Sequence, residues 1–138
     1  MSIATIANAM DVGDPSNFVR ILDLYKHSHE SITAEISGFR YTDEEISDSM
    51  RACKKENAYV LDPHGACGYQ ALIDGLQNDE TGIFLETAHP AKFLETVEKI
   101  IDEQIKIPQK LQVFMQGEKQ SVTMGKGFEE FKAYLKEV

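Results

Sequence analysis

One apolar run constrains the fold of this chain more than any other feature: residues 82–87 read GIFLET, with three apolar side chains in succession. Such a run is typical of a strand that is covered on both faces, as in parallel sheets. Pro90 and an apolar helical stripe over residues 93–101 follow at once, which predicts half of a βαβ unit. Elsewhere only residues 59–61 and 121–123 suggest brief extended segments. The sequence therefore predicts an incomplete α/β protein, whose missing strands come from a longer chain or from a partner.

Helical periodicity predicts most of the other elements. Apolar side chains at helical spacing indicate a helix from Pro15 to about His29, followed by a connection over residues 31–41. The sequence TDEE at 42–45 is a capping-box pattern, so a second helix begins there and ends near Asn57. Further helices are expected after Asp62, with the inward stripe Tyr69, Leu72, Ile73 and Leu76, and then near Pro90, Pro108 and Phe128.

Charge and length limit the classes of function. The 138 residues suit one domain or part of a larger one, and the formal net charge is -9. An acidic surface repels phosphate backbones, so neither nucleic acid nor an anionic membrane is an expected partner. No stretch approaches the ~20 apolar residues that span a bilayer, and no signal peptide is visible. Two cysteines without zinc-type spacing, Cys53 and Cys67, favour structural thiols in a cytoplasmic protein.

The segment DPHGACG at 62–68 is the first candidate site. It can be a helix N-terminus with Asp62 as N-cap and small residues that allow close packing. It can also face a ligand, with His64 donating a hydrogen bond. No metal site is expected in this chain, because His27 and His29 have no further ligand-type residues arranged nearby.

The segment TAHP at 87–90 is the second candidate site. Ligands of open α/β sheets bind beyond the carboxyl ends of strands, and Thr87 and His89 lie at that position. The alternative is that Thr87 caps the next helix and His89 is a satisfied interior histidine. Lys92 reads as a solvated residue of the first helical turn. Strand alternation places Glu86 and Thr87 on opposite faces, so only one of them can address a ligand.

Several motifs occur together along nearly the whole chain. They are NAMDVGDPSNF at 8–18, ISGF at 36–39, YTDEE at 41–45, LDPH at 61–64 and TAHPAKF at 87–93. In this order they resemble the threonine synthase family of bacteria and fungi. The resemblance implies that residues 1–138 are the C-terminal region of a fold type II pyridoxal-phosphate (PLP) enzyme, tryptophan synthase beta-like. Residues 1–104 would belong to the cofactor lobe and residues 105–138 to a C-terminal extension.

The resemblance also implies a reaction. Members of the family convert O-phospho-L-homoserine and water to L-threonine and phosphate, as carbon–oxygen lyases acting on phosphate. Their Schiff-base lysine and glycine-rich phosphate loop precede the region matched here, so no catalytic residue is assigned to this chain. The expected partners are the substrate O-phospho-L-homoserine and the N-terminal remainder of the same enzyme, and the chain alone is expected to be inactive and free of PLP. The alternative is a stand-alone, non-catalytic ligand- or protein-binding module derived from a PLP-enzyme lobe.

One cofactor contact follows from the resemblance. The family's TAHPAKF threonine is the partner of the pyridine nitrogen, and here that residue is Thr87. A neutral hydroxyl can donate to an unprotonated ring nitrogen, whereas a carboxylate would hold the nitrogen protonated. Two positions depart from the family: Glu86 stands where Ala or Gly is common, and Gly65 where Thr or Ala is common. The resemblance further suggests that the substrate end is lined by Asn8, Met10 and Asp11.

Overall fold

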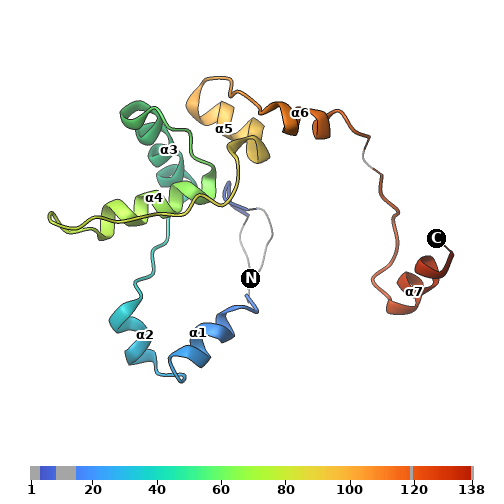
Figure 1. Ribbon diagram of the computed structural model, residues 1–138, viewed down its shortest axis with the longest axis horizontal. Helices are drawn as coiled ribbons and strands as arrows, with labels where there is room; N and C mark the ends of the chain where they lie inside the picture. The colour runs from blue at the N-terminus through green and yellow to red at the C-terminus, as the bar shows by residue number, and fades with distance from the viewer. Residues whose placement is uncertain (1–3, 9–14, 119, 138) are drawn as a thin grey trace. The chain divides into compact units, whose positions relative to one another are not determined.

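The computed structural model describes residues 4–8, 15–118 and 120–137, and the structural statements below concern these residues. Met10 and Asp11 lie outside them. In chain order the helices are α1 (Phe18–Leu24), α2 (His29–Glu35), α3 (Asp43–Asn57), α4 (Pro63–Gly75), the 3-10 turn η1 (Pro90–Phe93), α5 (Leu94–Ile101), α6 (Gln109–Met115) and α7 (Phe128–Glu137) (Figure 1). The chain divides into two compact units, Met1–Ile105 and Lys106–Val138.

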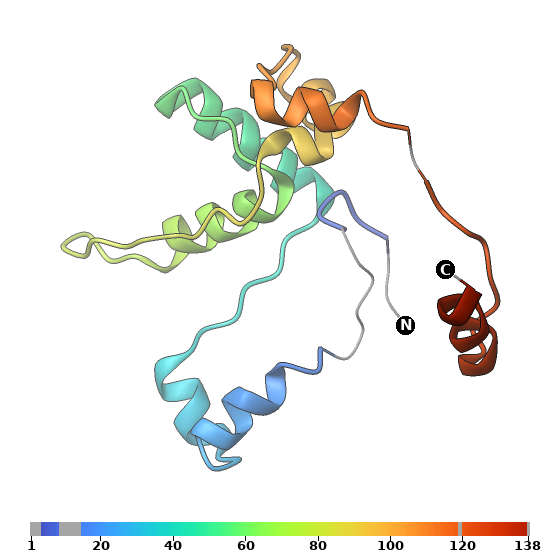
Figure 2. The same cartoon turned by 45° about the vertical axis from the view of Figure 1, so that its right-hand side comes forward.

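The strands expected over residues 82–87 and 121–123 are not formed: the described part of the chain contains helices only. A strand needs the backbone of a neighbouring strand for its ladder of hydrogen bonds, and no described segment supplies one. Residues 82–87 instead run beside α4, where a Cβ placed on Gly82 would meet the Leu72 side chain (Figures 1 and 2). Within this chain one face of the segment is uncovered, because Ile83 is 86% exposed.

The first expected helix, from Pro15 to about His29, is shorter than predicted, because α1 covers only Phe18–Leu24. α1 ends at Leu24, and both Lys26 and His27 have positive φ angles, 50° and 58°, which a helix cannot contain. Ser28 then caps α2, accepting a hydrogen bond from the Ser31 backbone N–H at 3.2 Å. α2 therefore occupies much of the stretch expected to be a connection. The missed signal was Ser28, which caps a helix that begins at His29.

The capping box predicted at 42–45 is confirmed. The Thr42 hydroxyl accepts the Glu45 backbone N–H at 3.3 Å, and the Glu45 carboxylate accepts the Thr42 backbone N–H at 2.7 Å. This reciprocal pair satisfies two backbone donors that the first turn of a helix would otherwise leave free. It fixes the start of α3, the longest helix and the centre of the core.

The core lies where α3 packs against α4 and α5. Its buried side chains include the predicted α3 stripe, and they are Ile46, Met50, Cys53, Leu61, Ala66 and Val97. The stripe predicted for α4 is only partly buried: Tyr69 and Leu72 are half-buried, but Ile73 is 51% exposed. The buried residues of α4 belong instead to its first turn, Pro63, Gly65 and Ala66. The small-residue segment is therefore the packed end of this helix.

The unit Lys106–Val138 contains α6 and α7 and is described by itself. Neither helix has a buried residue, and Phe114 and Phe128 are 80% and 70% exposed. Among the described residues, no helix is both long and apolar enough to cross a membrane. The division at Ile105 lies next to the expected boundary at residue 104, while the assignment of the two parts to a cofactor lobe and an extension stays a prediction.

Candidate functional site

The first wall of the candidate site is the N-terminus of α4. Asp62 is fully buried and is the N-cap, and its Oδ1 accepts the His64 backbone N–H at 2.8 Å. The same oxygen lies 3.2 Å from Nδ1 of the His64 ring. A carboxylate oxygen only accepts hydrogen bonds, so the tautomer that suits this contact carries its hydrogen on Nδ1, with Nε2 directed away from Asp62. The N-cap interpretation of this segment is confirmed, and a ligand-facing role for His64 stays a prediction.

The second wall is η1, which follows Thr87 and Ala88. His89 is its N-cap, and Nδ1 of the His89 ring accepts the Ala91 backbone N–H at 3.1 Å. Because Nδ1 accepts, this nitrogen is unprotonated and the ring's hydrogen is on Nε2. His89 is exposed, so it is not the interior histidine of the alternative interpretation, and its side chain, not that of Thr87, caps the turn.

The structure brings the two candidate segments together. The ring of His64 lies 5.2 Å from the ring of Phe93, measured between centroids. Glu86 reaches the same place from the segment before η1, where its Oε1 accepts the Asp62 backbone N–H at 2.9 Å. Two motifs that are more than twenty residues apart therefore share one corner of the fold. Lys92 is exposed beside this corner, with Nζ 5.4 Å above the Phe93 ring.

Side-chain exposure alternates along residues 82–88 as it does along a strand. Phe84 and Glu86 are half-buried, and Phe84 packs edge-on against Tyr69 with ring centroids 5.5 Å apart. Leu85 and Thr87 are exposed on the opposite face. Among the described residues, no hydrogen bond of the Thr87 side chain is found. The inference that Glu86 and Thr87 face opposite ways agrees with this pattern, and it leaves the Thr87 hydroxyl open to a ligand.

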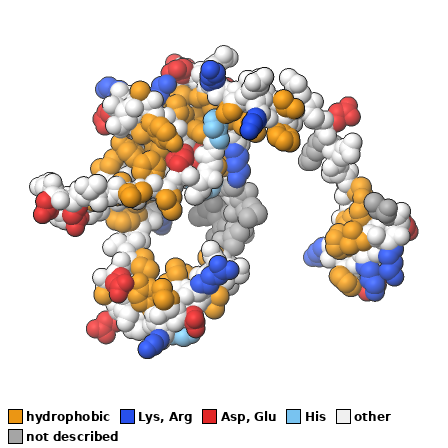
Figure 3. Space-filling view, in the orientation of Figure 1, with side chains coloured by type: hydrophobic (Ala, Val, Ile, Leu, Met, Phe, Trp, Pro, Cys, Tyr) orange, Lys and Arg blue, Asp and Glu red, His pale blue; other side chains and the backbone are white. Residues whose placement is uncertain are grey.

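Exposed apolar side chains lie on the same face of this segment as the Thr87 hydroxyl. The space-filling view shows apolar side chains gathered over α4 and the segment that follows it (Figure 3). Ile83 and Leu85, 86% and 78% exposed, belong to this segment. Exposed apolar surface of this kind is typical of a binding surface.

The cysteines contribute structure. Burial raises the pKa of both the Cys53 and Cys67 thiols, so each stays in the thiol form that is a poor nucleophile. Both are free, and Cys53 lies in the core. His27 and His29 are exposed near the start of α2, and no group of three metal-ligating side chains is found in the described stretches of the chain. Asn8, the one described member of the expected substrate end, is exposed.

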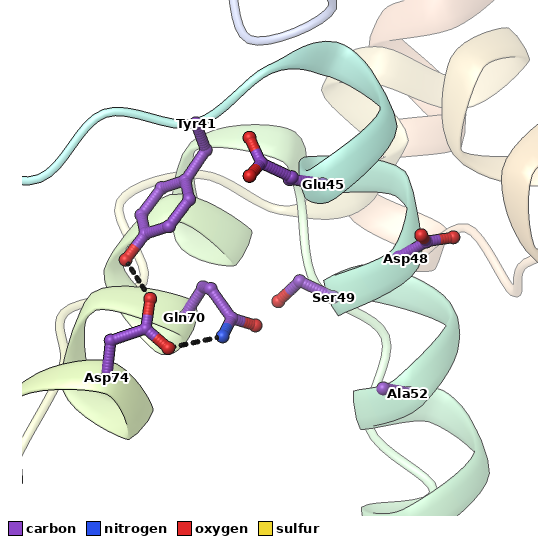
Figure 4. A pocket seen from close by; sticks show the side chains of 7 residues that line it. All are labelled: Tyr41, Glu45, Asp48, Ser49, Ala52, Gln70 and Asp74. Carbon is purple, nitrogen blue, oxygen red and sulfur yellow. Dashed lines mark hydrogen bonds between the residues drawn. The ribbon is translucent and has the colours of Figure 1, made fainter.

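Away from this corner, a pocket of about 400 Å³ lies between α3 and α4 (Figure 4). Its lining is Tyr41, Glu45, Asp48, Ser49, Ala52, Gln70 and Asp74. The Tyr41 hydroxyl donates to Asp74 Oδ2 at 2.7 Å, and Gln70 Nε2 donates to Asp74 Oδ1 at 2.8 Å. Burial, together with the hydrogen bond to Asp74, raises the pKa of Tyr41 to about 12. Three carboxylates make this pocket unsuited to a phosphate group, and its hydrogen bonds tie α4 to the start of α3.

Sequence reasoning treated Gly65 and Glu86 as two separate departures from a family pattern. The structure places them in contact, because a Cβ added at Gly65 would overlap the Glu86 carboxylate. It also joins Glu86 to Asp62 by a hydrogen bond that no sequence motif predicts. The available signal was that a residue smaller than usual and a residue larger than usual occur together.

Comparison with known proteins places the chain. Residues 65–135 match the family model for the C-terminal region of threonine synthase. The threonine synthase of Haemophilus influenzae is 42% identical over 134 residues, covering 97% of this chain and 31% of that protein. That of Serratia marcescens is 37% identical, with the same two shares covered.

Solved structures agree. The crystal structure of Escherichia coli threonine synthase superposes with a TM-score of 0.85 at 35% identity, over 99% of this chain and 31% of that chain. A PLP-bound threonine synthase from Brucella melitensis superposes at 0.86 and 22% identity, over 99% and 35%, and shows the fold alone. The fold is that of the C-terminal region of these enzymes. The chain belongs to the threonine synthase family, and it spans about a third of the length of the curated relatives it matches.

Proposed function

We propose that this chain is the C-terminal part of a cytoplasmic threonine synthase, a fold type II PLP enzyme that converts O-phospho-L-homoserine and water to L-threonine and phosphate. The observation that carries the proposal is the position of Thr87. It belongs to the TAHPAKF motif, and it stands on the open face of an extended segment, opposite the side from which Glu86 reaches Asp62. The family membership reported above supports the reaction.

The residues present fit a PLP ring on the open face of this segment, beside Thr87. The Thr87 hydroxyl is exposed, and the carboxylate next to it in sequence is turned to the Asp62 backbone instead. Thr87 would donate a hydrogen bond to an unprotonated ring nitrogen, and Glu86 would leave that nitrogen uncharged. When bound, the PLP ring withdraws electrons from the reacting carbon atoms of the substrate. Thr87 therefore orients the ring and sets the protonation state of its nitrogen.

The remainder of the active site would come from an N-terminal part of the same enzyme. That part would supply the Schiff-base lysine, the phosphate-binding loop and the strands that pair with residues 82–87. The exposure of Ile83 and Leu85 supports this arrangement, because a strand between two covered faces needs apolar side chains on both. A reading frame upstream that encodes a lysine-bearing lobe separates this proposal from a stand-alone binding module.

The test is Thr87→Val in the complete enzyme, because valine keeps the shape and removes the hydroxyl. We expect PLP affinity to fall about two- to tenfold, the value of one hydrogen bond, with a change in the cofactor's absorption spectrum. Thr87→Ser should restore both. The matched control is Thr81→Val, an exposed threonine at the other end of the same segment, which should behave as wild type. Wild-type affinity and spectrum in Thr87→Val would exclude the ring-nitrogen role.

A further inference from the structure

Glu86 occupies a space that Gly65 leaves open. Gly65 lies in the buried first turn of α4, and an added Cβ there would overlap both carboxylate oxygens of Glu86. Gly68, one turn further along, would bring a Cβ only to ordinary contact, 3.9 Å from Phe84. The absence of a side chain at position 65 therefore admits the Glu86 carboxyl group to the N-terminus of α4.

Two carboxylate oxygens at this corner have no hydrogen-bond partner among the described residues. Glu86 Oε1 accepts the Asp62 backbone N–H, and Asp62 Oδ1 accepts the His64 backbone N–H. The other oxygen of each carboxyl group, Asp62 Oδ2 and Glu86 Oε2, is buried without a hydrogen-bond partner. A buried polar atom without a partner costs free energy, and two acceptors cannot satisfy each other. The two carboxyl groups lie within hydrogen-bonding reach of each other, so a single proton between them would satisfy both.

Among the described residues, no lysine or arginine forms an ion pair with Glu86. The negative charge of Glu86 acts on Cys53 of α3 and on Tyr59 of the segment between α3 and α4. Burial raises the pKa of both of these groups, so both stay uncharged at neutral pH. From α4 it faces Asp62, whose Oδ1 also holds the His64 ring nitrogen. A second ionised carboxylate here would be a like charge beside Asp62, without a lysine or arginine to balance it.

We propose that Glu86 and Asp62 share one proton and form a singly charged acid pair, in which the neutral Glu86 O–H donates to Asp62 and so positions the His64 ring. Asp62 then receives hydrogen bonds on both oxygens, and its orientation is fixed. A fixed Asp62 holds Nδ1–H of His64 and directs Nε2 outward. Burial, followed by the hydrogen bond and negative charge of Asp62, raises the pKa of Glu86 to about 7, which agrees with this geometry. The inference concerns these residues alone and does not depend on the proposed reaction.

The first measurement is the titration of Glu86 in the complete polypeptide that carries these residues. The carboxyl carbon resonance of Glu86, identified by its absence in Glu86→Gln, should titrate with a midpoint near 7 instead of the usual 4.5. Gly65→Ala should move the midpoint toward 4.5, because the added methyl group displaces the carboxyl group. Gly68→Ala is the matched control and should leave it unchanged. A wild-type midpoint near 4.5 would overturn the proposal.

The second measurement separates positioning from the filling of space. Nitrogen NMR of His64 reports which ring nitrogen carries the hydrogen. Glu86→Gln keeps a donor to Asp62 and should preserve the Nδ1–H form, whereas Glu86→Met keeps the volume without a donor and should lose much of it. Identical His64 spectra in the two variants would show that Glu86 only fills space. Glu44→Gln, at an exposed carboxylate of α3, should change neither measurement.

Discussion

The packed corner of α3, α4 and α5 and the outer face of residues 82–87 differ in what the chain supplies for them. In the corner, the starts of α3 and α4 are capped by neighbours in sequence, and buried residues of the three helices pack together. On the outer face, Ile83 and Leu85 alternate with half-buried neighbours as in a strand, but no second strand is present among the described residues. Local interactions thus build the corner, while the face needs a distant part of a polypeptide. The difference explains why a sheet-forming sequence is found beside a purely helical fold.

The comparison is tested most strongly by truncating one leucine from each region. Leu61 is fully buried in the corner, so Leu61→Ala should lower the free energy of unfolding by about 2–5 kcal/mol. Leu85→Ala removes an exposed side chain and should change it by less than about 0.5 kcal/mol in this chain. Urea denaturation measures both.

The same pair sharpens the comparison when it is placed in the complete enzyme. If an N-terminal part covers the outer face, the cost of Leu85→Ala should rise into the range of a buried leucine, while the cost of Leu61→Ala stays similar. A negligible effect of Leu85→Ala in the complete enzyme would mean that the N-terminal part does not cover this face.

The capping box gives a smaller effect. Thr42→Ala removes the acceptor for the Glu45 backbone N–H and should lower the free energy of unfolding by about 1 kcal/mol. Thr42→Ser keeps the hydroxyl and should restore most of it, as measured by thermal denaturation. An alanine variant as stable as wild type would show that the start of α3 is held by its packing and not by its cap.

The sequence predicted what is local and missed what depends on distant or absent partners. The cap at Thr42, the proline start of α4 and the stripe of α3 were predicted because each involves residues within a few turns. The early end of α1 was missed, because the left-handed residues Lys26 and His27 carry no glycine signal, and α2 was missed because it lies in the stretch expected to be a connection. For residues 82–87, the alternation of side chains was predicted, because it depends only on an extended backbone. A paired strand is not formed in the described part of the chain, because pairing needs a second strand.

In the candidate site, too, local features were predicted and contacts between distant segments were missed. The motifs identified Thr87, His64 and His89 as candidates, and alternation along one segment gave the opposite directions of Glu86 and Thr87. The contact of Glu86 with Gly65 and Asp62 could not be predicted from spacing, because it joins segments more than twenty residues apart through side-chain volume. Thr87 as the ring-nitrogen partner stays a prediction that the variants described above test.

The smallest expected effect concerns the tie between Tyr41 and Asp74. Tyr41→Phe removes one hydroxyl from Asp74, which keeps the hydrogen bond from Gln70, so the free energy of unfolding should fall by only about 0.5 kcal/mol at neutral pH. The pKa of Tyr41 is raised from 10.0 to about 12, so wild type binds this proton more tightly when folded. Its contribution is therefore complete below about pH 10 and is lost as the pH rises toward 12. Denaturation between these values should show wild type losing stability that Tyr41→Phe does not lose, with Tyr134→Phe as a control outside the pocket. Parallel pH profiles for wild type and Tyr41→Phe would mean that α4 is held to the start of α3 by the packing of the corner alone.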